Sequence, residues 1–249
     1  MALLEDNEIR KEKKRIKERR VIESEVFDRS VLKALAQLMD KKIIRKMEFP
    51  ISKGKEAYVF RAVGGENAED HFLAVKIYMI ETSDFNHMQD YIRGDPRFVG
   101  IKKNKRDIVY AWAKKEFRNL KICEEAGVHV PSPYYFHSNV FVMKFIGDED
   151  SPAPLLKDVG PPDPEKNFKQ IVKDMKKMYR AGLVHADMSE FNILVWEGEL
   201  VIIDIGQGVS LEHPMANSFL ERDVENILKY FSKFGIKKEK EEILKEIKG

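Results

Sequence analysis

Residues 183–206 carry the sequence LVHADMSEFNILVWEGELVIIDIG, in which polar side chains flank two short apolar runs. Between these runs, the Glu-Gly-Glu at 197–199 has the composition of a hairpin turn. A hairpin brings its outer ends together, so we expect Asp187, Asn192 and Asp204 to converge. Two carboxylates and one amide oxygen at one point are hard oxygen ligands suited to Mg²⁺.

The first half of this stretch has the spacing His185-x-Asp187-x-x-x-x-Asn192, and the second half ends in D-I-G at 204–206. In such a pattern Asp187 can orient and deprotonate a nucleophile, which is typical of phosphoryl transfer in kinases. The alternative is an ordinary hairpin with solvated acids. The pattern H-x-D-x-x-x-x-N alone arises by chance fairly often. Chance rarely places it in the same hairpin as a strand that ends in D-I-G.

The composition indicates a globular protein of one or two domains. The 249 residues are 43% hydrophobic and 35% charged, yet the net charge is only +2, which argues against a general nucleic-acid coat protein. The single cysteine, Cys123, excludes an internal disulfide framework and a cysteine-rich metal site. No apolar run approaches the roughly 18 residues of a membrane span. We therefore expect a soluble, cytoplasmic protein without a membrane partner.

The N-terminal part is predicted to form accessory helices. Residues 10–20 contain eight basic residues and two glutamates. This run is either a solvated helix face or a contact with the phosphate backbone of RNA. Asp28 can cap the next helix, in which apolar residues recur at helical spacing.

A candidate phosphate-binding turn follows at 52–57, within an alternating strand pair at 49–63. The G-x-G-x-x-G loop of kinases appears here as Ser52-x-Gly54-x-x-Ala57. Small side chains let backbone N–H groups approach phosphates, although a plain hairpin is the better interpretation of this turn taken alone. The candidate nucleotide-binding residues of this turn are Ser52, Lys53, Gly54 and Lys55.

An apolar strand at 72–78 is interrupted by Lys76, which needs an anionic partner if it is buried. The alternative is an outward-facing lysine on a half-exposed strand. The helix predicted from about 107 to 125 has Glu116 on its apolar face. We therefore predict a Lys76–Glu116 ion pair, as in the lysine strand of kinases.

In a two-lobed kinase, the strand at 140–143 would lead into the hinge that holds adenine. By position, the base would contact the backbone of Lys144 and Ile146, with Met143 behind the ring. The polar segment at about 81–106 is predicted to be a long flexible loop or a short helix. The segment Val-Pro-Ser-Pro at 130–133 is predicted to be a break between regular elements.

The second half is predicted to be helical. Residues 148–164 are rich in proline and acidic residues and indicate a linker, and Asp163-Pro164 is a strong helix start. Asp223 is a candidate to hold the backbone of the loop around Asp187, or else a surface acid. Residues 237–248 alternate in charge and suggest a solvated terminal helix.

With these segments in order, the chain resembles the RIO family of atypical serine protein kinases over about residues 45–235. The absence of a winged-helix-like N-terminal domain points to the Rio-one-type subgroup, in a minimal form like that of archaea. The segments that carry the resemblance are GKEA at 54–57, WAKKEFRNL at 112–120, LVHADMSEFNIL at 183–194, IDIGQ at 203–207 and RDVENI at 222–227.

The resemblance implies an α+β, two-lobed protein-kinase-like fold with a small β-rich N-lobe and a helical C-lobe. The expected division is 1–47 for the accessory helices, 48–146 for the N-lobe and 147–249 for the C-lobe. Asp223 follows Asp204 by only 19 positions, so we expect a truncated C-lobe without a full activation segment.

The resemblance also implies binding of ATP with Mg²⁺ or Mn²⁺, serine autophosphorylation and a role in maturing the small ribosomal subunit. Lys76 would hold phosphates, Asp187 would be the catalytic base, and Asn192 with Asp204 would bind the metal ion. The physiological substrate and the oligomeric state stay open.

Other functions remain open at this point. Position 189, where protein kinases carry a phosphate-binding lysine, is Ser189, which puts fast transfer to free peptides in doubt. The site could instead serve an ATPase switch on pre-ribosomes, with Asp204 accepting phosphate. A scaffold that only binds nucleotide disagrees with the intact polar residues. A small-molecule kinase of the aminoglycoside type commonly has glycine where this chain has Ala186.

Overall fold

The computed structural model describes residues 26–81, 88, 91, 95, 97 and 104–249. Two predicted features, the basic run at 10–20 and most of the loop at 81–106, lie outside these residues. Within the described part of the chain, no helix has the length and apolar character needed to cross a membrane.

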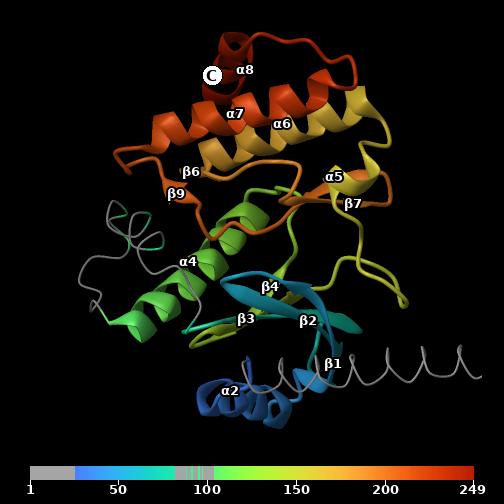
Figure 1. The fold of residues 1–249 in the computed structure, drawn as a ribbon, viewed down its shortest axis with the longest axis vertical. Coiled ribbons are helices and arrows are strands. Elements are labelled where there is room, and N and C mark those ends of the chain that lie inside the picture. Colours follow the sequence, from blue (N-terminus) through green and yellow to red (C-terminus); the bar gives the residue numbers. More distant parts are fainter. Residues whose placement is uncertain (1–25, 82–87, 89–90, 92–94, 96, 98–103) are drawn as a thin grey trace, which may run out of the picture.

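A five-stranded antiparallel sheet forms one lobe, with the strand order β1-β2-β3-β5-β4 (Figure 1). The helix α2, Arg29–Asp40, packs against its outer side, and its first turn is capped by Asp28 as predicted. The strands are β1 Ile44–Lys53, β2 Ala57–Gly64, β3 Phe72–Tyr78, β4 Pro133–His137 and β5 Val140–Lys144. Strand β1 begins at Ile44, before the expected start of the N-lobe at residue 48. The division of the chain at 47/48 stays a prediction.

The long helix α4, Lys105–Glu125, lies between the sheet and the second lobe (Figure 1). It begins two residues earlier than the predicted position 107, because Asn104 caps it by accepting a hydrogen bond from the Asp107 N–H. Lys76 in β3 is opposite Val59 in β2 and Phe141 in β5, so the lysine occupies the centre of the sheet.

The second lobe is mainly helical. Helices α6 and α7 contact each other through the rings of Phe168 and Phe231, and α8 packs against both helices (Figure 1). Its core is continuous with the apolar side of α4. The elements are α5 Leu156–Val159, α6 Pro164–Arg180, β6 Leu183–Val184, β7 Ile193–Trp196, β8 Glu199–Ile202, β9 Val209–Ser210, α7 Ala216–Ser232 and α8 Lys240–Lys248.

The predicted hairpin is confirmed as β7 and β8, which pair from Ile193–Ile202 to Trp196–Glu199. Its turn consists of Glu197 and Gly198, both with positive φ (52° and 81°). Such a two-residue turn matches the twist of antiparallel strands. At the open end, the Ile203 N–H donates to the Asn192 carbonyl at 2.9 Å, which brings the two halves of the motif together.

Three local expectations differ from the structure. Strand β4 begins at Pro133, within the segment interpreted as a break; it is an edge strand, where proline is tolerated. The linker at 148–164 contains the short helix α5. The terminal helix is not solvated all round, because Ile243 and Ile247 are buried against the second lobe.

Candidate active site

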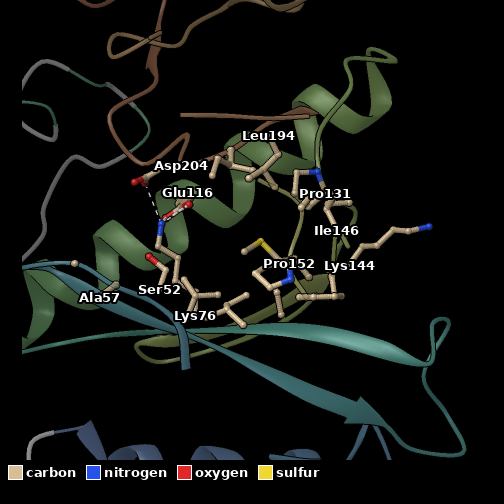
Figure 2. A pocket seen from close by; sticks show the side chains of 18 of the residues that line it. Ser52, Ala57, Lys76, Glu116, Pro131, Lys144, Ile146, Pro152, Leu194 and Asp204 are labelled. Carbon is tan, nitrogen blue, oxygen red and sulfur yellow. Dashed lines mark hydrogen bonds and ion pairs between the residues drawn. The ribbon is translucent and has the colours of Figure 1, made fainter. Parts of the chain in front are cut away.

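A cavity of about 370 Å³ opens between the sheet and the helical lobe (Figure 2). This volume lies within the range of small-molecule sites in proteins. Apolar side chains line it on both sides, so it forms a slot suited to a flat ring. These apolar residues include Ile51, Val59 and Ala74 from the sheet, Met143 from β5, and Leu194 and Ile203 from the hairpin.

One end of the slot is charged, and three side chains meet there (Figure 2). The Lys76 ammonium donates to both Glu116 oxygens at 2.7 and 2.8 Å and to Asp204 Oδ1 at 2.9 Å. This confirms the predicted Lys76–Glu116 ion pair. The contact between Lys76 and Asp204 was not predicted, because the sequence motif suggested a metal-binding role for Asp204.

Burial and charge act against each other in this cluster. Burial opposes the charged form of Lys76, but the carboxylates of Asp204 and Glu116 outweigh it and raise the lysine pKa. Burial also raises the pKa of Glu116, against the attraction of Lys76. The nearby Lys76 charge lowers the pKa of Asp204, whose side chain is 56% exposed. The ammonium is therefore a permanent cation at the end of the slot.

Tyr78 is a part of this cluster that sequence reasoning missed. Its hydroxyl donates to Glu116 Oε2, and its ring lines the cavity. The available signal was its position two residues after Lys76, since alternate residues of a strand share a face.

The turn predicted to bind phosphate closes the slot next to Lys76. Ser52, Gly54 and Lys55 line the cavity, and the Gly54 N–H donates to the Ala57 carbonyl at 2.9 Å. Lys53 is not among the lining residues; its ammonium lies 5.2 Å from the Tyr58 ring centroid.

The predicted hinge residues Met143, Lys144 and Ile146 line the opposite end. The Lys144 N–H already donates to the Ser132 carbonyl at 2.8 Å, so only its carbonyl is a candidate for adenine. The Ile146 carbonyl accepts from Ala153 at 2.9 Å, whereas its N–H has no hydrogen-bond partner among the described residues. Of the backbone groups of these two residues, the Lys144 carbonyl and the Ile146 N–H are thus not engaged in the hydrogen bonds named above.

Asp187 and Asn192 lie beside the cavity rather than in its lining. The Asn192 amide donates to the Asp187 carbonyl at 2.8 Å and to its Oδ2 at 3.0 Å. Gln207 donates to the same Oδ2 at 3.2 Å. Of the three residues expected to converge, Asp187 and Asn192 contact each other, whereas Asp204 contacts Lys76.

Helix α7 holds the loop that carries Asp187. Asp223 accepts from the N–H groups of Ala186 at 2.7 Å and Met188 at 2.9 Å, which confirms the predicted role and excludes a surface acid. Arg222 donates to the Ala186 carbonyl and Asn226 donates to the Met188 carbonyl. These contacts support the left-handed conformation of Ala186, whose φ is 65°.

His185 connects this loop to the end of the hairpin. Its Nε2 lies 3.3 Å from the Ile203 carbonyl, and its Nδ1 accepts from the Asp187 N–H at 3.3 Å. Burial lowers the pKa of His185 to about 4. The imidazole is therefore neutral and acts as a link within the site.

A slot for a flat ring between a sheet lobe and a helical lobe, with a buried lysine–glutamate pair at one end, defines a phosphotransferase of the protein-kinase-like class. A family model described as the RIO domain matches residues 58–244. The chain belongs to the RIO family.

Named relatives agree with this assignment. The RIO-type serine/threonine-protein kinase Rio1 of Haloferax volcanii is 44% identical, over 86% of this chain and 73% of its own length. The Rio1 of Methanocaldococcus jannaschii is 41% identical, over 94% of this chain and 81% of its own. Human serine/threonine-protein kinase RIO1 is 37% identical, over 89% of this chain but only 40% of its own. The activity class of the chain is ATP-dependent phosphotransfer.

The fold also matches a solved structure. The Rio2 kinase of Chaetomium thermophilum, crystallised as an ADP/Mg²⁺-phosphoaspartate complex, has a TM-score of 0.65 and 22% identity. The match covers 86% of this chain and 65% of that one. This confirms the predicted two-lobed, kinase-like α+β fold.

Proposed function

We propose that the protein transfers the terminal phosphate of ATP to serine or threonine hydroxyls, including serines of its own chain. The observation that carries the proposal is the Lys76–Glu116 pair at the charged end of an apolar slot. An aromatic base fits the slot, and the lysine provides a fixed positive charge for phosphates.

ATP would lie with its base at the hinge and its phosphates at the turn 52–57. The Lys144 carbonyl and the Ile146 N–H would bond to adenine, with Met143 behind the ring. Ser52, Gly54 and Lys55 would stand over the phosphates, and Lys76 would bind them while Glu116 holds its ammonium in place. Lys53, being outside the cavity lining, is the weakest of the proposed nucleotide contacts.

Asp187 would orient the acceptor hydroxyl and accept its proton. Its Oδ2 is already fixed by Asn192 and Gln207, so the carboxylate is held in one orientation before a substrate arrives. Positioning of this kind supplies much of the rate of phosphoryl transfer.

The donor set fits a divalent cation. Asp204 offers a half-exposed carboxylate, and the Asn192 amide nitrogen faces Asp187, which leaves its oxygen as the group available to a metal ion. Hard oxygen donors of this type suit Mg²⁺ or Mn²⁺. When bound, the ion would neutralise charge on the phosphates.

The test is phosphate transfer from radiolabelled ATP to the purified protein. We expect wild type to label itself on serine, and Asp187→Asn, which preserves shape, to lose about 10²-fold or more of the rate, as for removal of a general base. Unchanged labelling in Asp187→Asn would remove Asp187 from the mechanism. The alternative of an aspartyl-phosphate on Asp204 is distinguished by the label itself: hydroxylamine would release it, whereas phosphoserine would persist.

A role in maturing the small ribosomal subunit, in the cytoplasm, is the part of the proposal that rests on the family resemblance. Sedimentation of the tagged protein with precursor small subunits on sucrose gradients would support it. Sedimentation only as free protein would contradict it.

A further inference from the structure

The turn at 205–208, directly after Asp204, is held by a side chain to which the proposed chemistry gives no role. Lys115 of α4 is completely buried, and its ammonium donates to the carbonyls of Gly206 at 2.7 Å and Gly208 at 2.5 Å. Trp112 lies beside it, with 5.1 Å between the ammonium and the ring centroid. Burial lowers the pKa of Lys115 to about 7, so the interior disfavours its charge. A lysine in so unfavourable a position needs a reason beyond packing.

Asn119, one helical turn further along α4, binds the same turn. Its amide nitrogen donates to the carbonyls of Ile205 and Gly208, both at 2.9 Å. Its amide oxygen accepts from Arg97 at 3.0 Å, and Arg97 forms an ion pair with Asp95. Both ends of the Asn119 side chain are thus engaged, which keeps it in one orientation.

The turn lies too close to α4 to shift toward it. A Cβ added to Gly206 would come within 3.0 Å of the Trp112 indole nitrogen, and one added to Gly208 within 2.9 Å of the Asn119 amide nitrogen. Only glycine permits this approach of backbone to helix. The hydrogen bonds and the close contact together attach the turn rigidly to α4.

Two residues of the site take their positions from this turn. Asp204 precedes it with a φ of 59° and faces Lys76, while Gln207 lies within it and donates to Asp187. The neighbour of Lys115 on the helix is Glu116, which holds Lys76. Helix α4 therefore influences the positions of three site residues. It holds Lys76 through Glu116, and through the turn it holds Asp204 and, by way of Gln207, Asp187.

We propose that Lys115 and Asn119 are positioning residues, which fix the turn 205–208 and so hold Asp204 for the metal ion and Gln207 for Asp187. The proposal rests on the proposed kinase function. It assigns to α4 a second task in addition to presenting Glu116.

The test compares Lys115→Met with Lys114→Met, its exposed neighbour on the same helix. Phosphate transfer is measured against Mg²⁺ concentration, and ADP affinity is measured in EDTA. We expect Lys115→Met to raise the Mg²⁺ requirement about tenfold or more, the usual effect of losing a group that orients a metal ligand. Affinity for ADP without metal should be unchanged, because neither residue lines the cavity. Lys114→Met should behave as wild type in both measurements.

Asn119→Ala serves as a second variant, since it removes two hydrogen bonds to the turn without adding bulk. If Lys115→Met fails to fold, Asn119→Ala still tests the proposal, and we expect it to raise the Mg²⁺ requirement by the same amount. If wild type transfers phosphate and the folded variants keep its Mg²⁺ dependence, the positioning role is wrong. If wild type neither binds ADP nor transfers phosphate, the proposed function fails first, and this proposal with it.

Discussion

His185 shows how one buried side chain connects the stability of the fold to the site. It is 2% exposed, and its two ring nitrogens face the Ile203 carbonyl and the Asp187 N–H. In the folded chain it resists protonation until about pH 4. The unfolded chain takes up that proton near the ordinary histidine pKa of about 6.5. Between these values the unfolded state binds more protons, so stability falls as the pH is lowered.

We therefore predict that wild type loses about 2 kcal/mol more unfolding free energy between pH 7 and pH 5 than His185→Gln does. Glutamine keeps a donor and an acceptor but cannot titrate. Urea denaturation at the two pH values measures the difference. His71→Gln, the same exchange at an exposed position, is the matched control. Equal pH dependence in wild type and His185→Gln would contradict the assignment of this proton to His185.

Helices α4 and α7 act as rigid supports for loops that have little structure of their own. Helix α7 holds the residues around Asp187 through Arg222, Asp223 and Asn226, and α4 holds the turn after Asp204. Sites built on such elements keep their geometry because the loops cannot move independently of the helices.

Removal of one such contact should lower the rate of phosphate transfer and leave the binding of ATP unchanged. Asn226→Ala loses one hydrogen bond to the Met188 carbonyl, worth about 1 kcal/mol. If that energy holds the loop in its reactive position, kcat falls about fivefold while the KM for ATP stays constant. Steady-state kinetics measures both. Glu221→Ala, exposed on the same helix, is the control, and a raised KM with unchanged kcat would show that α7 supports ATP binding instead.

The nucleotide cavity joins the two lobes of the molecule. The sheet lobe contributes Lys76 and the turn 52–57, and the helical lobe contributes Asp204 and the hairpin (Figure 2). A ligand in this cavity contacts both lobes at once and binds only the folded chain, so it stabilises the whole fold.

Thermal unfolding should show the stabilisation by ADP and by Mg²⁺ as two separate steps. ADP alone should raise the unfolding midpoint, and Mg²⁺ should raise it further; a ligand at 100 times its Kd contributes about 2.7 kcal/mol. Asp204→Asn should keep the first shift and lose the second, because only the metal step needs the carboxylate. Asp40→Asn, an exposed acid at the end of α2, is the control. A full Mg²⁺ increment in Asp204→Asn would remove Asp204 from metal binding.

The amino-acid sequence alone determined the features with a local signature. The β7–β8 hairpin followed from its turn residues and apolar runs, and the Lys76–Glu116 pair followed from two charges set in apolar patterns. Cap residues placed the start of α2 and of α6. Each of these depends on the periodicity of neighbouring residues, which a single sequence displays.

Only the tertiary structure decided how Asp204 turns toward Lys76 and how Lys115 holds the turn beyond it. These partners are 128 and 91 residues apart in the chain, respectively. Strand β4 likewise exists because β5 pairs with it, although its proline-flanked segment suggested a break. Periodicity shows which face of a helix or strand is buried, but it does not show which distant residue that face contacts. The partner is set by how the two lobes pack against each other.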